Sequence, residues 1–361
     1  MPMTSTTPTI AEAFSLQAHA CRLLGSEYTA DLLNALRTDL EAGGPTAELL
    51  ADYDLPPVPS AMALRVAGGI HGLLLAGRVP ALDRWYPLRG AAARDPAFAA
   101  ALRAVVAAER DWLRDFLSHP VQTNEVARSA ALAPGFMEIA ARTGRPLSLR
   151  EIGSSGGLNL LWDRFAYRFA GRDFGAPDAP VRLEPEWRGA APPPAPLPTV
   201  LDRRGVDIHP LDLRDDLVLA RGLAYLWPDQ PERLERYRTA VELLRASDLR
   251  VETGSAPEWL ETVLATPTPG ATTVVFHSIM WQYMPPPVRA ATESVIRSAG
   301  ARADRSRLLA WLRFEPNKTA NDFELTLDLW PGSGLRNRLA TLHPHGAIVD
   351  WHPDVVEGSA D

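Results

Sequence analysis

Lysine is almost absent from this chain. Of the 37 basic residues among 361, Lys318 is the only lysine and all others are arginine. A phosphate-binding loop needs a lysine directly after its glycine run, and a Schiff-base enzyme needs a desolvated lysine amine. Lys318 lies between Asn317 and Thr319, in a stretch that we expect to be a surface turn. The composition therefore argues against P-loop nucleotide hydrolases and pyridoxal-type enzymes.

Cysteine and long apolar runs are also scarce. The single cysteine, Cys21, excludes an internal disulfide and a cysteine-rich zinc site, and it fits a reducing compartment. No uncharged apolar run reaches about 18 residues, and the first eight residues have neither a basic start nor an apolar core. We therefore expect a cytoplasmic protein with no membrane partner.

An excess of positive charge is missing as well. The formal net charge is −7, whereas binding to a phosphate backbone requires a basic surface. We expect no nucleic-acid partner and a small-molecule substrate instead. The apolar content of 46% allows a full hydrophobic core, and the length fits one large domain with an appendage, or two domains.

Two regions differ in their hydrophobic pattern. From about residue 10 to residue 142, apolar side chains recur at helical spacing, as in Leu32, Leu33, Leu36 and Leu40. We predict an all-helical N-terminal domain over residues 1–143, lying on the substrate side. The cluster Gly68–Gly72 falls inside this pattern, where glycines most simply permit close helix packing.

After Pro146, short apolar runs alternate with helical stretches, which is typical of a parallel sheet with crossover helices. We predict an α/β domain over residues 144–361 with a doubly wound, Rossmann-like sheet. The expected strands are Leu147–Ile152, a piece ending at Ile208, Leu249–Thr253, Thr272–His277, Leu308–Phe314, Phe323–Trp330 and Ala347–Trp351. The expected helices are Leu158–Arg164, Pro231–Arg245, Ala256–Leu264 and Pro287–Ala299.

An insertion at about residues 164–200 separates the first two predicted strands. It combines an aromatic stretch, from Phe165 to Trp187, with a proline-rich connector. At their alternating spacing the aromatic side chains are more typical of the packed face of a hairpin than of a binding cage.

A glycine-rich turn follows the first predicted strand. Glu151 lies inside the strand just before the turn, Gly153, Ser155 and Gly157 form the turn, and a predicted amphipathic helix beginning at Leu158 follows. Glycines let backbone N–H groups approach a ligand, and a helix N-terminus favours a nucleotide-type group. A tight connection without a ligand is about as common for such a turn taken alone.

Two further loops are expected at the same sheet edge. Asp207 and Ile208 end the next strand, where an acid can hold a ribose diol, and Gly254 and Ser255 follow the strand after it. Taken alone, Asp207 would be interpreted as a solvent-exposed acid of a loop. Its separation from the turn in the sequence also exceeds the roughly 20 residues expected in a plain dinucleotide-binding fingerprint. The convergence of three loops on one crevice carries the interpretation.

This set of motifs resembles class I S-adenosylmethionine-dependent methyltransferases. The likeness covers Glu-x-Gly-x-x-Gly-Gly from Glu151, Gly-Val-Asp-Ile from Gly205, and the strand Thr273–Ser278. It implies that the turn holds the methionine end, Asp207 the ribose, and the Gly254–Ser255 loop the adenine of S-adenosylmethionine. Ser155 replaces the usual middle glycine, Ser255 replaces a common aspartate, and no Asn/Asp-Pro-Pro-aromatic tetrad follows. The missing tetrad argues against methylation of exocyclic base amines.

A closer resemblance is to the bacterial family called domain of unknown function 2332. It rests on the Gln-Thr-Asn-Glu segment, the Gly-Leu-Asn-Leu segment that contains Asn159, and Val274–Ser278, and it spans nearly the whole chain. The first segment comprises Gln122, Thr123, Asn124 and Glu125. The likeness implies that these residues line the cofactor pocket, although an N-cap of the following helix is an equally good explanation.

His277 and Glu125 are the candidate bases. His277 ends an apolar strand where substrate would meet a methyl group, although a buried histidine bonded to a carbonyl is about as common. Arg128 is one of several arginines that could hold an anionic substrate. We expect no metal: His343 and His345 lack a nearby carboxylate or cysteine at ligand spacing.

The sequence thus predicts a small-molecule methyltransferase with an unassigned O, S or N acceptor, and two alternatives stay open. Gly153–Gly157 also spells Gly-x-Ser-x-Gly, so Ser155 could be a hydrolase nucleophile with Asp328 or Asp350 and His343 or His352. Alternatively, the protein binds a nucleoside or S-adenosylmethionine without catalysis. A nicotinamide dehydrogenase fits less well because the insertion interrupts the compact dinucleotide-binding unit.

Overall fold

The computed structural model describes residues 8–87, 94–317, 320, 322–332 and 337–354. Lys318 and its expected turn lie outside these residues. The chain divides into two compact units. The first comprises residues 1–123 and 215–235, and the second comprises residues 124–214 and 236–361. The chain therefore crosses between the units three times, and helix α9 (Pro231–Arg245) contributes to both.

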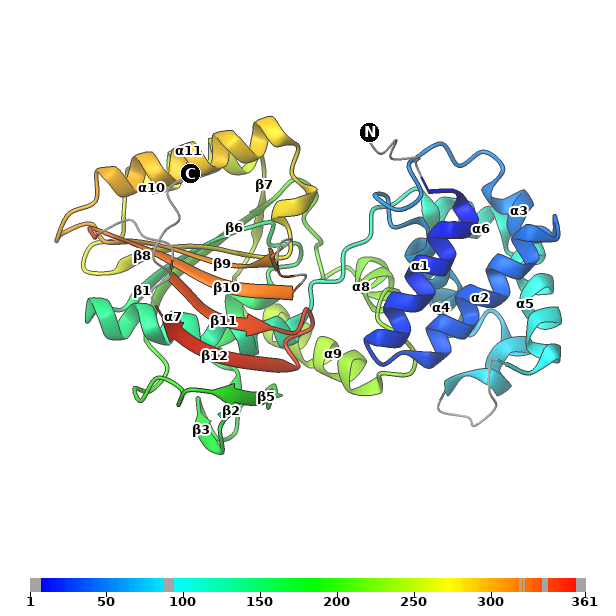
Figure 1. The fold of residues 1–361 in the computed structure, drawn as a ribbon, viewed down its shortest axis with the longest axis horizontal. Helices are drawn as coiled ribbons and strands as arrows, with labels where there is room; N and C mark the ends of the chain where they lie inside the picture. Colours follow the sequence, from blue (N-terminus) through cyan, green and yellow to red (C-terminus); the bar gives the residue numbers. More distant parts are fainter. Residues whose placement is uncertain (1–7, 88–93, 318–319, 321, 333–336, 355–361) are drawn as a thin grey trace. The chain divides into compact units, whose positions relative to one another are not determined.

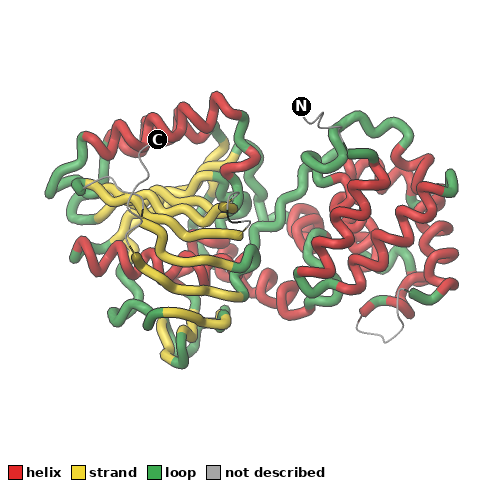
Figure 2. The backbone as a smooth tube through the Cα atoms, viewed as in Figure 1, coloured by secondary structure: helices red, strands yellow, loops and turns green. Residues whose placement is uncertain are grey.

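The first unit, as far as the structure describes it, is built from helices alone (Figure 2). Besides part of α9, these are α1 Ile10–Leu23, α2 Glu27–Glu41, α3 Pro45–Leu50, α4 Met62–Leu75, the 3-10 helix η1 Pro80–Trp85, α5 Pro96–Ala108, α6 Arg110–Leu117 and α8 Asp216–Ala224.

Close helix contacts hold this unit together. A Cβ atom on Gly68 would lie 2.8 Å from the Tyr225 ring, and one on Gly69 would lie 2.8 Å from Leu113. The interpretation of the Gly68–Gly72 cluster as a packing feature is therefore confirmed. The carboxylate of Asp229 accepts hydrogen bonds from Ser26 Oγ and the Tyr28 amide, which fastens residues 215–235 to the start of α2.

The second unit contains a large sheet (Figure 1). Its strand order is β5-β12-β11-β10-β9-β8-β1-β6-β7. The strands are β1 Leu147–Ile152, β5 Glu186–Gly189, β6 Val200–Asp207, β7 Val251–Thr253, β8 Thr272–Ser278, β9 Leu309–Asn317, β10 Asp322–Trp330, β11 Asn337–Leu342 and β12 Ile348–Asp354. The expected α/β class is confirmed.

Most neighbouring strands in this sheet run parallel. β1 pairs in parallel with both β6 and β8, with Glu151 opposite Gly205 on one side and Phe276 on the other. β7 and β9 extend the parallel part, and β9 to β12 form an antiparallel meander. Because successive parallel strands lie on opposite sides of β1, its carboxyl end is a point where the chain switches direction across the sheet.

Helices cover both faces of the sheet (Figure 1). Helix α7 (Ser129–Thr143) lies against one face, where Phe136 contacts Phe276 and Gly135 fits against Leu312. Helices α10 (Ala256–Ala265) and α11 (Pro286–Ala301) cover the opposite face over a core that includes Ile152 and Trp311. Alternate residues of β8 and β9 therefore face different helices.

The insertion forms a small separate sheet, as its aromatic pattern predicted. Strand β2 (Ala166–Phe169) pairs antiparallel with β3 (Arg172–Phe174) and parallel with β4 (Arg182–Leu183). Phe169 packs against Phe174 and Trp187. Trp187 itself belongs to β5, which joins the large sheet beside β12.

Several elements differ from the sequence expectation. Residues Leu158–Arg164 form the 3-10 helix η4 rather than an amphipathic α-helix, because Leu158–Trp162 are all buried and β2 begins directly afterwards. The sequence did not indicate α8 or β11. Helix α7, placed by the sequence in the 1–143 domain, belongs to the α/β unit because it packs on the sheet, and residues 215–235 belong to the helical unit.

Candidate functional site

The glycine-rich turn lies at the carboxyl end of β1 and is built on left-handed backbone. Gly153 has φ 67° and Gly157 has φ 79°, and a Cβ atom at these positions would lie 2.8 Å from Met280 and 2.9 Å from Val251. Ser155, with φ 53°, adopts the same region without being glycine. Left-handed backbone costs energy for a side-chain-bearing residue, so surrounding contacts must hold Ser155 in place.

Asp207 provides such a contact from the end of β6. Its Oδ2 accepts a hydrogen bond from the Ser155 amide at 2.8 Å, and its Oδ1 accepts one from the His209 amide at 2.9 Å. The structure therefore brings the acid and the turn together. The next residue, Ile208, is 64% exposed, which is unusual for a large apolar side chain beside a buried acid.

The Gly254–Ser255 loop, which follows β7, contacts Asp207 through its backbone. The Gly254 amide donates to the Asp207 carbonyl at 3.0 Å, and Ser255 begins α10 as its N-cap residue without a side-chain cap. Ser255 is half-buried. The loops after β1, β6 and β7 therefore meet at one edge of the sheet.

Glu151 is a buried carboxyl group directly before the turn. It is 2% exposed, and its Oε2 has no hydrogen-bond partner among the described residues. Burial raises the pKa of Glu151 well above its usual range, and the nearby charge of Asp207 raises it further. Ser154 and Arg128 oppose this rise. The site therefore contains a buried carboxyl group with a raised pKa, and one of its oxygens has no partner among the described residues.

Hydrogen bonds join the segment that contains Asn124 and Glu125 to the segment that contains Leu158 and Asn159. Asn124, in left-handed backbone with φ 37°, accepts a hydrogen bond from the Leu158 amide at 3.1 Å. The Asn159 Oδ1 accepts from Ser129 Oγ at 2.7 Å, and its Nδ2 donates to the Glu125 carbonyl at 3.3 Å. We call Asn124, Glu125, Ser129, Leu158 and Asn159 the latch. It ties η4 to the start of α7.

Glu125 caps the 3-10 helix η3 (Val126–Arg128), whereas the N-cap interpretation expected Asn124 or Thr123 as the cap and Glu125 in the first turn. Its Oε1 accepts a hydrogen bond from the Ala127 amide at 3.1 Å and lies 3.8 Å from Arg236. The carboxylate is thus buried and already engaged by backbone and charge. Gln122 and Thr123 are half-buried at the end of the helical unit.

His277 is fully buried near the end of β8, and its Nδ1 lies 2.6 Å from Glu315 Oε1. The partner is thus a carboxylate and not a backbone carbonyl. The same oxygen accepts bonds from the Met280 and Trp281 amides, at 3.1 and 3.2 Å. The Trp281 indole stacks on the imidazole, with ring centres 5.0 Å apart.

The sequence analysis did not identify Glu315. A signal was present, because Trp311, Arg313 and Glu315 alternate along a strand that is otherwise apolar, and charged residues in a buried strand normally need partners. Arg313 is bonded to Thr326 and Asp328 across β10. The β8–β9 register places Arg313 opposite His277. Glu315 lies two residues farther along β9, on the same face of the sheet as Arg313, which brings it close to His277.

Arg128 joins the end of β8 to the turn after β11. Its guanidinium donates to the carbonyl oxygens of Ser278 and Pro344, both at 3.2 Å. Gly346 fits closely here, because a Cβ atom would lie 2.1 Å from the Ala127 carbonyl oxygen. The His343–Gly346 turn is therefore positioned by η3.

The acids named for the hydrolase alternative are engaged elsewhere. Asp328 forms a 2.7 Å ion pair with Arg313, and both side chains are buried. Asp350 pairs with His352 at 2.8 Å on β12, where both side chains are exposed. Neither acid occupies the loops around Ser155.

The described part of the chain offers no group of three or more histidine, cysteine, aspartate or glutamate residues placed to hold a metal ion. Within the same residues, no helix has the length and apolar character needed to cross a membrane.

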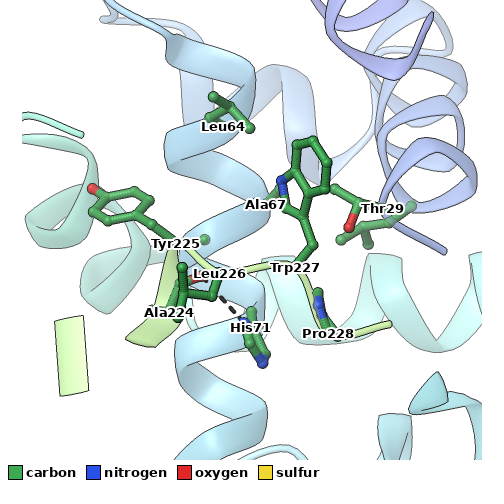
Figure 3. A pocket seen from close by; sticks show the side chains of 11 residues that line it. Thr29, Leu64, Ala67, His71, Ala224, Tyr225, Leu226, Trp227 and Pro228 are labelled. Carbon is green, nitrogen blue, oxygen red and sulfur yellow. Dashed lines mark hydrogen bonds between the residues drawn. The ribbon is translucent and has the colours of Figure 1, made fainter. Parts of the chain in front are cut away.

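The helical unit contains a small cavity of its own (Figure 3). Its volume is about 10 Å³, room for about one water molecule. His71 lines it, and its two ring nitrogens lie 3.2 Å from the Ala224 carbonyl and 3.1 Å from the Tyr86 hydroxyl. Its size does not fit an organic substrate.

Comparison with known proteins places the chain in a family. No curated protein matches it. Residues 11–351 match the model of an uncharacterized protein family conserved in bacteria, DUF2332. Since the match covers nearly the whole chain, the protein belongs to the DUF2332 family.

Proposed function

We propose that the α/β unit binds S-adenosylmethionine and that the protein is a methyltransferase for a small molecule. The observation that carries this proposal is the bond between Asp207 and the Ser155 amide, at the carboxyl ends of β6 and β1. It joins the predicted ribose-binding acid to the predicted methionine-binding turn. Ligands of open α/β sheets bind in this position, where the strand order reverses.

The order of the parallel strands supports the proposal. Taken in chain order, β7-β6-β1-β8-β9 reads 3-2-1-4-5, as in doubly wound nucleotide-binding sheets. The first crossover contains η4 and the small aromatic sheet where a regular helix is usual, and β10 is antiparallel. The proposal therefore depends more on the residues of the site than on the similarity of the sheet to nucleotide-binding sheets.

The residues at this edge fit the chemical groups of S-adenosylmethionine. The unpartnered Glu151 Oε2 suits the ammonium group, which supplies both a donor and a positive charge. Each oxygen of Asp207 accepts one backbone bond and keeps a second lone pair for a ribose hydroxyl. Ile208, exposed beside Asp207, offers an apolar surface for a flat base.

S-adenosylmethionine supplies an electrophilic methyl group on a sulfonium centre. The residues of the chain bind and orient the reactants, and in-line positioning accounts for much of the rate in such transfers. The His277–Glu315 pair at the adjacent strand ends favours catalysis over binding alone, because a carboxylate-oriented imidazole is a typical proton acceptor.

Calorimetric titration with S-adenosylmethionine and S-adenosylhomocysteine tests the proposal. We expect both to bind the wild-type protein, Ile208→Ala to weaken binding, and Asp207→Asn to weaken it further. Ile208 is exposed, so its substitution does not disturb the core. Leu201→Ala is the matched control, because Leu201 is also exposed on or beside β6 but at the opposite end of the strand.

Each result has a defined meaning. Wild-type protein that binds neither compound would remove the proposal, as would equal effects of the Ile208 and Leu201 variants. Stoichiometric labelling of Ser155 by a fluorophosphonate would favour the hydrolase. Binding without any turnover of the methyl group over a broad acceptor panel would favour a non-catalytic nucleoside-binding protein.

A further inference from the structure

We propose that Glu315 is a positioning residue that fixes His277 as the proton acceptor of the site, and that the Trp281 indole covers one face of the imidazole ring. This inference rests on the proposed function and specifies its acceptor. The substrate would be a molecule that loses an O–H or N–H proton on methylation. Acceptors without such a proton, such as thioethers, would not need the pair.

The hydrogen bonds of Glu315 fix the proton of the histidine ring. Its Oε1 accepts from two backbone amides and lies 2.6 Å from His277 Nδ1. An oxygen that already accepts two bonds from amides acts as the acceptor here, so Nδ1 carries the proton. In a neutral imidazole the other nitrogen, Nε2, is then unprotonated and able to accept a proton.

That second nitrogen is buried and unused. His277 Nε2 has no hydrogen-bond partner in the part of the chain that the structure describes, and the side chain is fully buried. A buried acceptor without a partner destabilises the folded state, so a histidine with a purely structural role would normally have both ring nitrogens hydrogen-bonded. The cost is explained if a substrate supplies the missing donor.

The segment from Ile279 to Tyr283 covers the pair. Trp281 stacks nearly parallel to the imidazole, at 12°, and the 3-10 helix η5 (Trp281–Tyr283) continues to Tyr283, which is 70% exposed. Ile279 has φ 51°, a conformation that a β-branched residue rarely adopts. Glu315 bonds the amides of this segment and the histidine, so one carboxylate connects the cover to the base.

The proton balance of the step is simple. As the bond between the acceptor atom and the methyl carbon forms, the sulfur–methyl bond breaks and its electron pair remains on sulfur. The acceptor proton moves to Nε2, and the imidazolium is stabilised by the Glu315 carboxylate. The proton then leaves to water when the cover opens.

Nuclear magnetic resonance of ¹⁵N-histidine protein without ligand tests the role of Glu315. Of the eight histidines, His277 is assigned by the signals lost in His277→Gln. We expect a protonated, strongly downfield Nδ1–H and an unprotonated Nε2. In Glu315→Gln the side-chain oxygen of the glutamine can still accept a hydrogen bond from Nδ1–H but carries no negative charge, so the resonance of the Nδ1 proton should move upfield. Glu315→Asp keeps the charge and should restore part of the downfield shift.

The exposed Asp350–His352 pair is the matched control. Its carboxylate contacts Nε2, so His352 should show the opposite pattern of ring protons, and Asp350→Asn should leave the His277 signals unchanged. A wild-type His277 protonated on Nε2, or a Glu315→Gln variant with an unmoved Nδ1 proton, would overturn the inference.

Acylation by diethyl pyrocarbonate, followed by mass spectrometry, tests the cover. Trp281→Ala should speed the modification of His277 several-fold and leave His352 unaffected, and an unchanged His277 rate would show that Trp281 is not the cover. The calorimetric titration separates this inference from the proposed function. If S-adenosylmethionine does not bind but the ring signals are as expected, the proposed function and the proton-acceptor role of His277 are refuted, and only the positioning of His277 by Glu315 stands. If it binds but the ring signals differ, the inference about Glu315 and His277 is refuted and the proposed function stands.

Discussion

Single residues at the carboxyl edge of the sheet carry unusual electrostatics. Glu151 is buried, its Oε2 has no partner within the described ranges of the chain, and its pKa is raised chiefly by that burial. The folded state therefore binds a proton that the unfolded chain has lost above about pH 4.5, the ordinary pKa of the group. Stability then falls as pH rises from that value through the folded pKa.

Glu151→Gln should remove this penalty. The amide is neutral at every pH, so we expect the variant to gain stability over wild type as pH rises from 5 to 8, by up to about 1.4 kcal/mol per pH unit while the folded acid stays protonated. Urea unfolding at several pH values measures the difference. Glu261→Gln, at an exposed position of α10, is the control. A constant difference across this range would contradict the prediction.

The residues of the site could be named from sequence only in part. Asp207 and Gly153 were identifiable because each follows a predicted strand in a known motif, and the structure places Asp207 beside the turn. Glu315 escaped detection because it lies 38 positions from His277. Their contact depends on the β8–β9 register, which a single sequence does not specify.

At the scale of elements, the central strands β1 and β8 were predictable and β11 was not. The expected strand Leu147–Ile152 matches β1, and Thr272–His277 falls one residue short of β8, because both are continuous buried runs. β11 contains Asn337 and Arg338 and lacks such a run. η4 was mistaken for an α-helix because its apolar residues follow a glycine turn, although tertiary packing buries them on all sides.

The glycine turn should be intolerant of side chains beyond the usual cost of left-handed backbone. Gly153→Ala and Gly270→Ala face similar strain, at φ 67° and 77°, but only the first would contact a neighbour, Met280. We expect Gly270→Ala to cost about 1 kcal/mol and Gly153→Ala about 1 kcal/mol more. Equal losses in urea unfolding would mean that Met280 moves aside freely.

The latch should behave as a coupled unit. Asn159→Leu leaves the Ser129 hydroxyl and the Glu125 carbonyl buried without their partner, which should cost about 1–3 kcal/mol. Adding Ser129→Ala to that variant should cost less than Ser129→Ala alone, because the unsatisfied hydroxyl disappears. A double-mutant cycle measures this coupling, expected above about 0.5 kcal/mol. Additive effects would show that the two bonds are independent.

The whole molecule consists of two compact units that do not follow the order of the chain. Residues 215–235 leave the α/β unit and complete the helical one, where Trp227 joins the core and Asp229 anchors α2. The sequence analysis placed one boundary near residue 143 because hydropathy changes there. It could not show that a later segment returns, since that depends on contacts between residues about 200 positions apart.

This organisation predicts that stability and binding can be separated. Asp229→Ala removes two acceptors at the start of α2 and should lower the free energy of unfolding of the helical unit by about 1–3 kcal/mol. Its calorimetric affinity for S-adenosylmethionine should stay within a factor of two of wild type, a difference of less than about 0.5 kcal/mol. Asp207→Asn should lower that affinity while leaving the Asp229 contacts intact. If Asp229→Ala weakened binding as strongly as Asp207→Asn, the ligand site would depend on the helical unit and could not be assigned to the edge of the sheet alone.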